Sequence, residues 1–185
     1  MSAEVATYRF SVEECDKLGE AGIFDEDDRV ELLDGEIIVM SPIGSQHAGV
    51  VMRLNAILSR RLGDRVLLNP QNPTMVDEFS EPQPDIMLLK PRADFYTTKH
   101  PGPEDILLLI EVSDTTLSYD RGRKLRKYAE SNIGEAWIAN PKNMTIEQFR
   151  EPAGRAYAHT TSHHRGESIS VAALPERFTV EELIG

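Results

Sequence analysis

Two acidic residues stand at the ends of the two most apolar segments of the chain. Asp85 begins the segment DIMLL directly after Pro84, and Glu111 follows the apolar run 106–110. If these segments are neighbouring antiparallel strands, both carboxylates lie at one end of a sheet. Buried carboxylates are costly unless they are paired or bind a cation, and two close together repel each other. The pair therefore predicts a site for Mg²⁺ or Mn²⁺, which prefer oxygen ligands, and the alternative is that each acid caps a turn.

A basic helix follows Glu111 and carries a lysine that could complete this site. Asp120, Lys124 and Tyr128 are spaced four residues apart, so on a helix over 120–131 they share one face. A strand, a helix and a parallel strand form a right-handed crossover, which starts this helix near the sheet end that carries Glu111. We therefore expect Lys124 to reach back toward Glu111. The alternative is an ordinary surface ion pair between Asp120 and Lys124.

The remaining pattern predicts a mixed α/β protein with a central sheet. The Asp34-Gly35 pair between apolar segments predicts a β-hairpin over 30–39. Apolar residues spaced by three and four predict an amphipathic helix over 46–62. The other expected elements are helices at 11–20 and 179–185 and strands at 66–68, 74–76, 85–89, 106–112, 136–139, 144–149 and 168–171.

The length and composition are those of a single domain spanning residues 1–185. Apolar residues make up 40% and charged residues 28% of the chain, which excludes a mainly disordered chain, a collagen-like repeat and a coiled-coil rod. The net charge of −11 has the opposite sign to that of a generic polyanion-coating protein. The one cysteine, Cys15, fits a reducing compartment, and neither a signal peptide nor a membrane span is visible. We therefore expect a cytoplasmic protein.

Five sequence blocks occur in an order that resembles a known family. The blocks are RVELLDGEIIVMSP, a helix beginning near His47, QPDIMLL, LLIEVSD and DRGRKLRKYAESNIGEAWIANP. Together they resemble the Uma-type "putative restriction endonuclease" family of the PD-(D/E)XK phosphodiesterase superfamily, over about residues 29–141. The resemblance implies a restriction-endonuclease-like core, in which helices flank a mixed central sheet, with an extra N-terminal hairpin and extra C-terminal strands.

The resemblance implies a role for each residue of the family motif. Asp85 matches the acid of the first half of the superfamily motif, and Glu111 matches the acid of the second half. Two positions later, where the superfamily has a lysine, this chain has Ser113. The family places its lysine on the following helix, in a D-x-x-x-K-x-x-x-Y pattern. Lys124 is the matching position, and Lys127 is the second choice.

The same resemblance implies a metal-dependent endonuclease that hydrolyses DNA phosphodiesters. Asp85, Glu111 and the carbonyl of Val112 would hold one or two Mg²⁺ ions, with Mn²⁺ as a substitute. Glu31 matches an acid that the family places near the site, and its alternative role is a strand-edge carboxylate. His47 matches a histidine at the start of the first core helix, where its alternative role is a polar helix terminus.

A chain of net charge −11 needs a local basic face to bind DNA. The expected face consists of the phosphate-contact candidates Arg121, Arg123 and Lys127, together with Arg53, Arg60 and Arg61 on the first long helix. Acidic residues 26–28 and 181–182 would then lie elsewhere. We expect weak, salt-sensitive DNA binding, and a homodimer because cutting two strands requires two sites.

Two other interpretations fit the same residues. The chain could keep the nuclease fold as a binding or assembly module with a decayed site, which the serine at position 113 and the acidic charge favour. Retention of Asp85, Glu111 and Lys124 together argues against decay. The remaining alternative is another phosphoester hydrolase or an unrelated metal site.

Overall fold

A six-stranded mixed sheet forms the centre of the computed structural model, which describes residues 6–25, 28–114 and 116–185. Neighbouring strands are antiparallel except for one parallel pair, β5 and β6. In spatial order the strands are β3 (Leu67–Pro70), β4 (Ile86–Leu89), β5 (Ile106–Val112), β6 (Glu135–Asn140), β7 (Thr145–Ala153) and β8 (Ala156–His164). The predicted mixed α/β class and the parallel crossover after Glu111 are confirmed.

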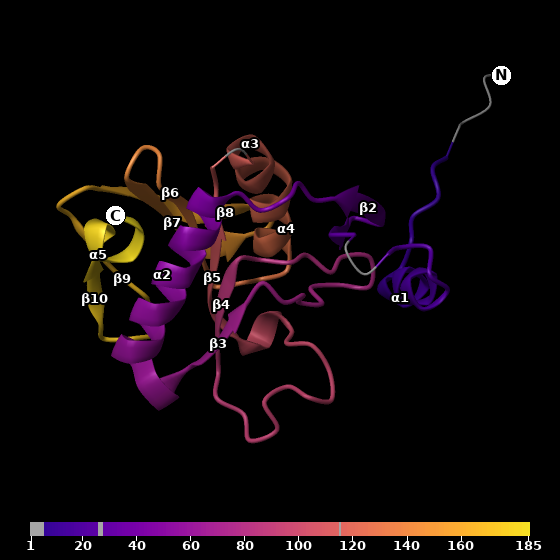
Figure 1. Cartoon of the computed structure of the whole chain (residues 1–185), viewed down its shortest axis with the longest axis horizontal. Coiled ribbons are helices and arrows are strands. Elements are labelled where there is room, and N and C mark those ends of the chain that lie inside the picture. Colours follow the sequence, from indigo (N-terminus) through magenta and orange to yellow (C-terminus); the bar gives the residue numbers. More distant parts are fainter. Residues whose placement is uncertain (1–5, 26–27, 115) are drawn as a thin grey trace.

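Helices cover both faces of this sheet (Figure 1). One face packs against α2 (Ser45–Leu62) and α5 (Val180–Ile184), and the other against α4 (Leu125–Glu130). Side chains alternate between the faces of a strand, so within β4 Leu88 joins the α2 side and Met87 joins the α4 side. Both side chains are fully buried, which explains why β4 has no polar residue between its ends.

The N-terminal part of the chain adds a capped helix and a hairpin. In α1 (Val12–Glu20), which was predicted, Ser11 and Glu14 form a capping box. The hairpin pairs β1 (Val30–Leu33) with β2 (Glu36–Val39) through the predicted turn at Asp34-Gly35. Gly35 has a φ of +77°, and a Cβ there would lie 2.6 Å from the Cβ of Arg9, so the turn requires glycine.

The C-terminal part differs from the prediction in its strands. β8 and the short strand β10 (Arg177–Thr179) were not predicted, and β10 pairs antiparallel with β9 (Ser168–Ser170). The strand predicted at 74–76 is absent, because Val76 forms a tight turn in which its N–H donates to the carbonyl of Ser80. The expected additions to the core, an N-terminal hairpin and C-terminal strands, are present.

The helix predicted over 120–131 starts earlier and is interrupted. It begins as α3 (Leu117–Tyr119), widens into a π-helical turn over Asp120–Lys124, and continues as α4. In the π turn the N–H of Leu125 donates to the carbonyl of Asp120, five residues back. The turn contains Gly122, a poor helix former, and π turns of this kind often occur at functional sites.

None of the helices within the described ranges is both long and apolar enough to cross a membrane.

Candidate active site

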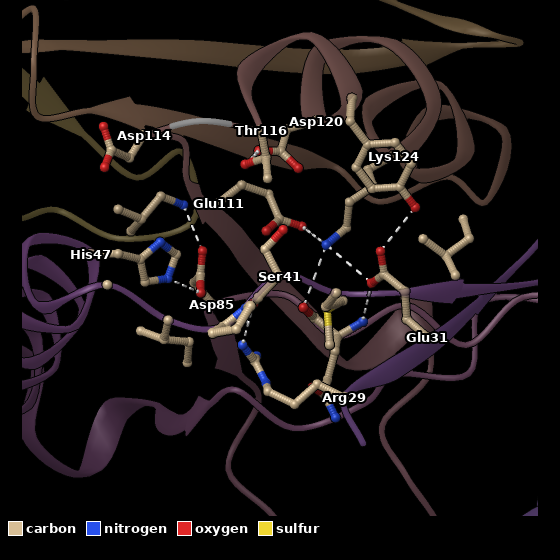
Figure 2. Close-up of a pocket in the computed structure, with 18 of the residues that line it drawn as sticks. Arg29, Glu31, Ser41, His47, Asp85, Glu111, Asp114, Thr116, Asp120 and Lys124 are labelled. Carbon is tan, nitrogen blue, oxygen red and sulfur yellow. Dashed lines mark hydrogen bonds and ion pairs between the residues drawn. The ribbon is translucent and has the colours of Figure 1, made fainter. Parts of the chain in front are cut away.

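Asp85 and Glu111 lie at the same end of the sheet. β4 and β5 pair antiparallel with Ile86 opposite Ile110, so the two acids are the next positions beyond this pair. Both carboxylates line one pocket, which Figure 2 shows from close by. The predicted strand arrangement is therefore confirmed, while the catalytic roles of the two acids stay predictions.

Asp85 is held by partners from two elements. His47, in the first turn of α2, contacts Asp85 Oδ1 through Nε2 at 2.7 Å. The backbone N–H of Val112 donates to Asp85 Oδ2 at 2.8 Å. The hydrogen bond to Asp85 raises the pKa of His47, against the opposing effect of burial. The carboxylate of Asp85 is thus fixed in direction at the pocket wall.

Glu111 is buried beneath the helix. Its Oε1 accepts a hydrogen bond from Tyr128 Oη at 2.5 Å and lies 2.8 Å from Lys124 Nζ. Burial raises the pKa of Glu111 to about 8, opposed by the attraction of Lys124 and reinforced by repulsion from Asp120 and Asp85. The positive charge near Glu111 is therefore too small to offset the burial of its ionised form, and a further cation would favour that form.

Lys124 lies between two carboxylates. Its Nζ is 3.2 Å from Glu31 Oε2, in addition to the contact with Glu111, and it donates to the carbonyl of Gln83 at 3.4 Å. Burial alone would lower the pKa of Lys124, but the neighbouring carboxylates outweigh it and raise the pKa. Lys124 therefore stays charged, and its position beside Glu111 agrees with the sequence prediction.

Glu31 completes the cage around the lysine. It projects from β1, where its Oε2 accepts the N–H of Gln83 at 3.0 Å and its Oε1 accepts the hydroxyl of Tyr119 at 2.9 Å. Its side chain is 1% exposed. Glu31 is thus a buried partner of Lys124 and not an exposed strand-edge carboxylate.

Asp120 does not form the surface pair with Lys124 that was the alternative interpretation. Its Oδ2 accepts hydrogen bonds from Ser113 Oγ at 2.7 Å and from Thr116 Oγ1 at 2.6 Å. Burial raises the pKa of Asp120, although Lys124 and the two hydroxyl groups oppose the shift. The residue at the position of the superfamily lysine, Ser113, therefore anchors the start of the helix that carries Lys124.

The pocket has a volume of about 400 Å³ and two unlike walls. One wall carries the charged groups: Glu31, His47, Asp85, Glu111, Asp120 and Lys124. The other wall is the end of β2 and the loop that follows it, residues 38–44. In Figure 2, Arg29 lies below the carboxylates of Asp85 and Glu111, and Thr116 and Asp120 lie above them.

The donor set fits a hard divalent cation that keeps part of its shell for water and substrate. Asp85 and Glu111 offer carboxylate oxygens, and Glu111 Oε2 receives no hydrogen bond from the described residues. Within the same residues, no group of three or more His, Cys, Asp or Glu side chains is arranged to hold a metal ion. Mg²⁺ is commonly bound by one or two carboxylates together with substrate phosphates, so the pair suffices for that ion.

The three predicted phosphate contacts lie outside the pocket, and each is paired with a carboxylate. Arg121 Nε contacts Glu147 at 2.6 Å, and Arg123 Nη1 contacts Glu36 at 2.8 Å. Lys127 is nearly buried, and its Nζ lies 2.5 Å from Asp34. These contacts favour a structural role, so the phosphate role of the three residues stays a prediction from the local cluster of basic residues.

The predicted separation of basic and acidic faces is wrong for the first long helix. Arg61 Nη1 contacts Glu182 at 2.6 Å, and Arg53 donates to the carbonyl of Glu181 at 3.4 Å. Both acids belong to α5, which packs beside α2, so they lie next to the face that was expected to be basic, and Glu182 neutralises Arg61. Glu26 and Asp27, expected away from that face, lie outside the described residues.

Sequence reasoning missed the pocket residues that local spacing does not reveal. Tyr119 precedes the predicted helix by one residue, and only the π turn brings it over Glu31. Gln83 contributes backbone groups, which no residue type signals. One sequence signal could have found the apolar loop 38–44, because the apolar pattern of β2 continues as far as Pro42.

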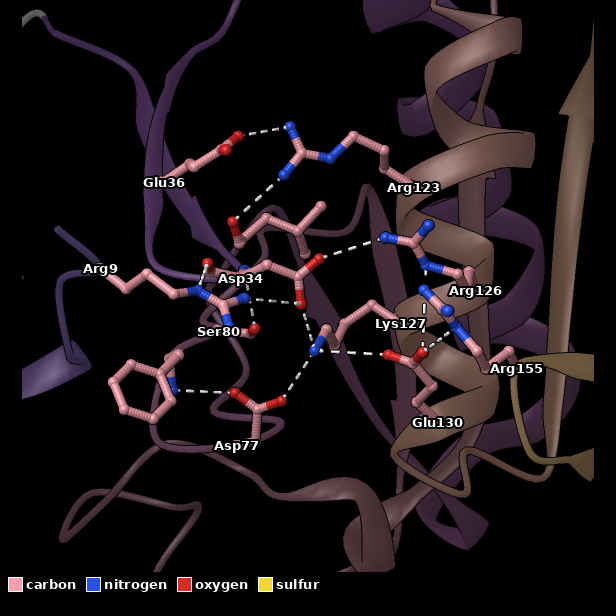
Figure 3. A network of polar contacts seen from close by, with 12 residues as sticks. Arg9, Asp34, Glu36, Asp77, Ser80, Arg123, Arg126, Lys127, Glu130 and Arg155 are labelled. Atoms are coloured by element: carbon pink, nitrogen blue, oxygen red, sulfur yellow. Dashed lines mark hydrogen bonds and ion pairs between the residues drawn. The ribbon is translucent and has the colours of Figure 1, made fainter. Parts of the chain in front are cut away.

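A second set of ion pairs joins the same hairpin to the same helix outside the pocket (Figure 3). Lys127 Nζ lies 2.5 Å from Asp34, 3.0 Å from Asp77 and 3.5 Å from Glu130. Asp34 and Lys127 each follow, by three residues, the pocket pair formed by Glu31 and Lys124. The hairpin and the helix are therefore joined at two levels, one inside and one outside the pocket.

Replacing Lys127 with Met is expected to lower the free energy of unfolding by about 1–2 kcal/mol. The change leaves three carboxylates without their shared cation, and all three, Asp34, Asp77 and Glu130, are partly exposed, which limits the cost. Urea unfolding measures the effect against Lys142→Met, a change at an exposed lysine. Equal stability of the two variants would contradict a positioning role for Lys127.

The comparisons with known proteins agree with this geometry. A family model named Uma2 and described as "Putative restriction endonuclease" matches residues 12–181, from α1 into α5. A solved structure from Anabaena variabilis ATCC 29413, described as "a putative nuclease belonging to DUF820", has a similar fold, with a TM-score of 0.69 and 13% sequence identity over 95% of this chain and 97% of that chain. No curated protein matches the chain. With a family match over most of its length, and with the fold of a nuclease-like relative, the chain belongs to the Uma2 family.

Proposed function

We propose that the protein is a metal-dependent endonuclease that hydrolyses backbone phosphodiesters of DNA. The observation that carries this proposal is the convergence of Asp85, Glu111 and Lys124 in one pocket, from two strands and a helix. Family membership supports a nuclease, and the pocket supports the choice of residues.

The charge of the pocket supports the need for a divalent cation. Five carboxylates line the pocket together with two cationic side chains, Lys124 and Arg29, so the excess negative charge would repel the phosphate of an incoming DNA strand. Asp85 and Glu111, with the Val112 carbonyl, would hold Mg²⁺ or Mn²⁺. A bound ion of this kind lowers the pKa of a water molecule and offsets the charge that develops on the phosphate.

The protein's own groups would orient the reacting atoms. Lys124 is a charged donor held by Glu31, so its ammonium group can stabilise a non-bridging phosphate oxygen without first being desolvated. His47 contacts Asp85 and can accept a proton near the attacked phosphate. Glu31 would act through Lys124 and not on the substrate directly.

DNA binding is expected to be weak and to fall as salt rises, because its attractive part is electrostatic. The homodimer also stays a prediction. We expect it because one pocket would cut one strand, and cutting both strands requires two pockets. Sedimentation of the purified chain at several concentrations measures the oligomeric state directly.

A decayed nuclease-fold module is the competing proposal. Two observations favour it: Lys124 is already neutralised by two carboxylates, and no three-residue metal cluster occurs among the described residues. In this alternative the Glu31–Lys124–Glu111 arrangement serves folding only.

The deciding experiment is nicking of supercoiled plasmid with Mg²⁺ or Mn²⁺ and with EDTA. We expect cleavage by the wild type only with metal, and loss of cleavage in Asp85→Ala. Asp64→Ala, at an exposed aspartate beyond the far end of α2, is the matched control and should cleave normally. Cleavage that survives in Asp85→Ala would contradict the proposed site, and absence of cleavage with every metal would favour the decayed module.

A further inference from the structure

Four of the charged side chains that line the pocket are almost entirely buried. The side chains of Glu31, Lys124 and Glu111 are 1%, 4% and 6% exposed, and that of Asp85 is 12% exposed. A phosphate must therefore enter the pocket to meet them. A duplex is stiff, so its backbone bends into a recess only at an energetic cost, whereas the backbone of a single strand bends easily and can carry a phosphate into the pocket.

The opposite wall of the pocket offers an apolar surface at the entrance. It consists of Ile38, Val39, Met40, Pro42 and Ile43. Val39 is 78% exposed and Ile43 is 39% exposed, which is unusual for branched apolar side chains that line a polar site.

The backbone of this apolar loop is tied to Arg29. Met40 donates its N–H to the carbonyl of Arg29 at 2.8 Å, and Arg29 Nη1 donates to the carbonyl of Ser41 at 3.4 Å. The entrance therefore has a defined shape before any substrate arrives.

Most of the described basic side chains on the segment from the π turn into α4 are already paired, so few are free to contact the phosphates of a long duplex. Arg121, Arg123 and Arg126 each contact a carboxylate, as does Lys127. Duplex binding depends on many phosphate contacts, whereas a single strand can be held by a few contacts and by its base faces.

We propose that the pocket binds one unstacked nucleotide of single-stranded or locally unpaired DNA. The phosphate faces Lys124 and the carboxylates, and the base lies against the apolar wall formed by Val39 and Ile43. A volume of about 400 Å³ lies in the usual range for a small-ligand site. This inference rests on the proposed function, because it names the substrate of the same pocket.

The test compares short labelled oligonucleotides that differ only in structure: a single strand, the matching duplex, and a single strand with abasic positions. Binding is measured by fluorescence anisotropy in the presence of Ca²⁺, and cleavage in Mg²⁺ or Mn²⁺. We expect the single strand to bind at least about tenfold more tightly than either the duplex or the abasic strand. Its logarithmic salt slope should be about −0.7 to −1.4, as for one or two phosphate contacts of a single strand.

Val39→Ser and Ile43→Ser should reduce the preference for the single strand over the abasic strand several-fold. Ile23→Ser is the matched control, since Ile23 is 63% exposed and does not line the pocket. Equal binding of duplex and single strand, or an unchanged preference in both pocket variants, would overturn the inference. Failure to cut any substrate would overturn the proposed function, and the binding measurements would still decide the inference.

Discussion

Replacing Glu111 with Gln is expected to lower metal-dependent cleavage at least about a hundredfold while leaving the protein folded. The amide removes a charged oxygen from the proposed metal site. It also removes a buried anion whose pKa burial raises to about 8, and Lys124 keeps Glu31 as its counter-charge. The free energy of unfolding should therefore stay within about 1 kcal/mol of the wild type.

Plasmid nicking at saturating Mg²⁺ and urea unfolding measure the two quantities on the same preparation. Glu13→Gln, at an exposed glutamate of α1, is the control for the chemical change. Cleavage within tenfold of the wild type would contradict a role for Glu111 in the site. A large loss of stability would show instead that Lys124 needs both carboxylates.

Replacing Lys124 with Met, in contrast to Glu111→Gln, is expected to destabilise the protein strongly. It should lower the free energy of unfolding by about 3–5 kcal/mol. The change leaves Glu31 and Glu111 buried without their shared cation, at 1% and 6% exposure of their side chains. The double variant Glu31→Gln with Lys124→Met should recover part of the loss, because it removes Glu31, one of the two carboxyl groups that lost their cation.

Urea unfolding of the single and double variants forms a double-mutant cycle for this interaction. Lys142→Met removes an exposed lysine and should change stability by less than about 0.5 kcal/mol. If Lys124→Met were as stable as that control, the buried ion pairs would contribute nothing to folding. In that case only catalysis could explain why the lysine occupies this position.

The sheet and the central pair of acids were predictable because strong local signals define them. Asp85 begins one apolar run and Glu111 follows the other, which left few ways to arrange two buried strands. The rule that such crossovers are right-handed then placed Lys124 near Glu111. β8 was missed because it is polar and mostly exposed along its length, so its residues show no alternation between a buried and an exposed face.

The partners of the basic residues were not predictable for a different reason. Arg123 pairs with Glu36, 87 positions away, and Arg61 pairs with Glu182, 121 positions away. Charge spacing along one helix reports only neighbours three or four residues apart, so it counts such arginines as available when the fold has already paired them. Local clusters of basic residues therefore overstate the basic surface that this fold presents.

The π turn between α3 and α4 changes the direction in which the side chains of α3 point. It closes a hydrogen bond across five residues instead of four, which offsets the preceding residues by about 100° relative to a continuous α-helix. Deleting Gly122 would restore the regular ladder and swing Tyr119 away from Glu31, while Lys124 and Tyr128 stayed over the sheet. One inserted residue thus lets Tyr119 contact Glu31 while Lys124 and Tyr128, further along the same helical segment, contact Glu111.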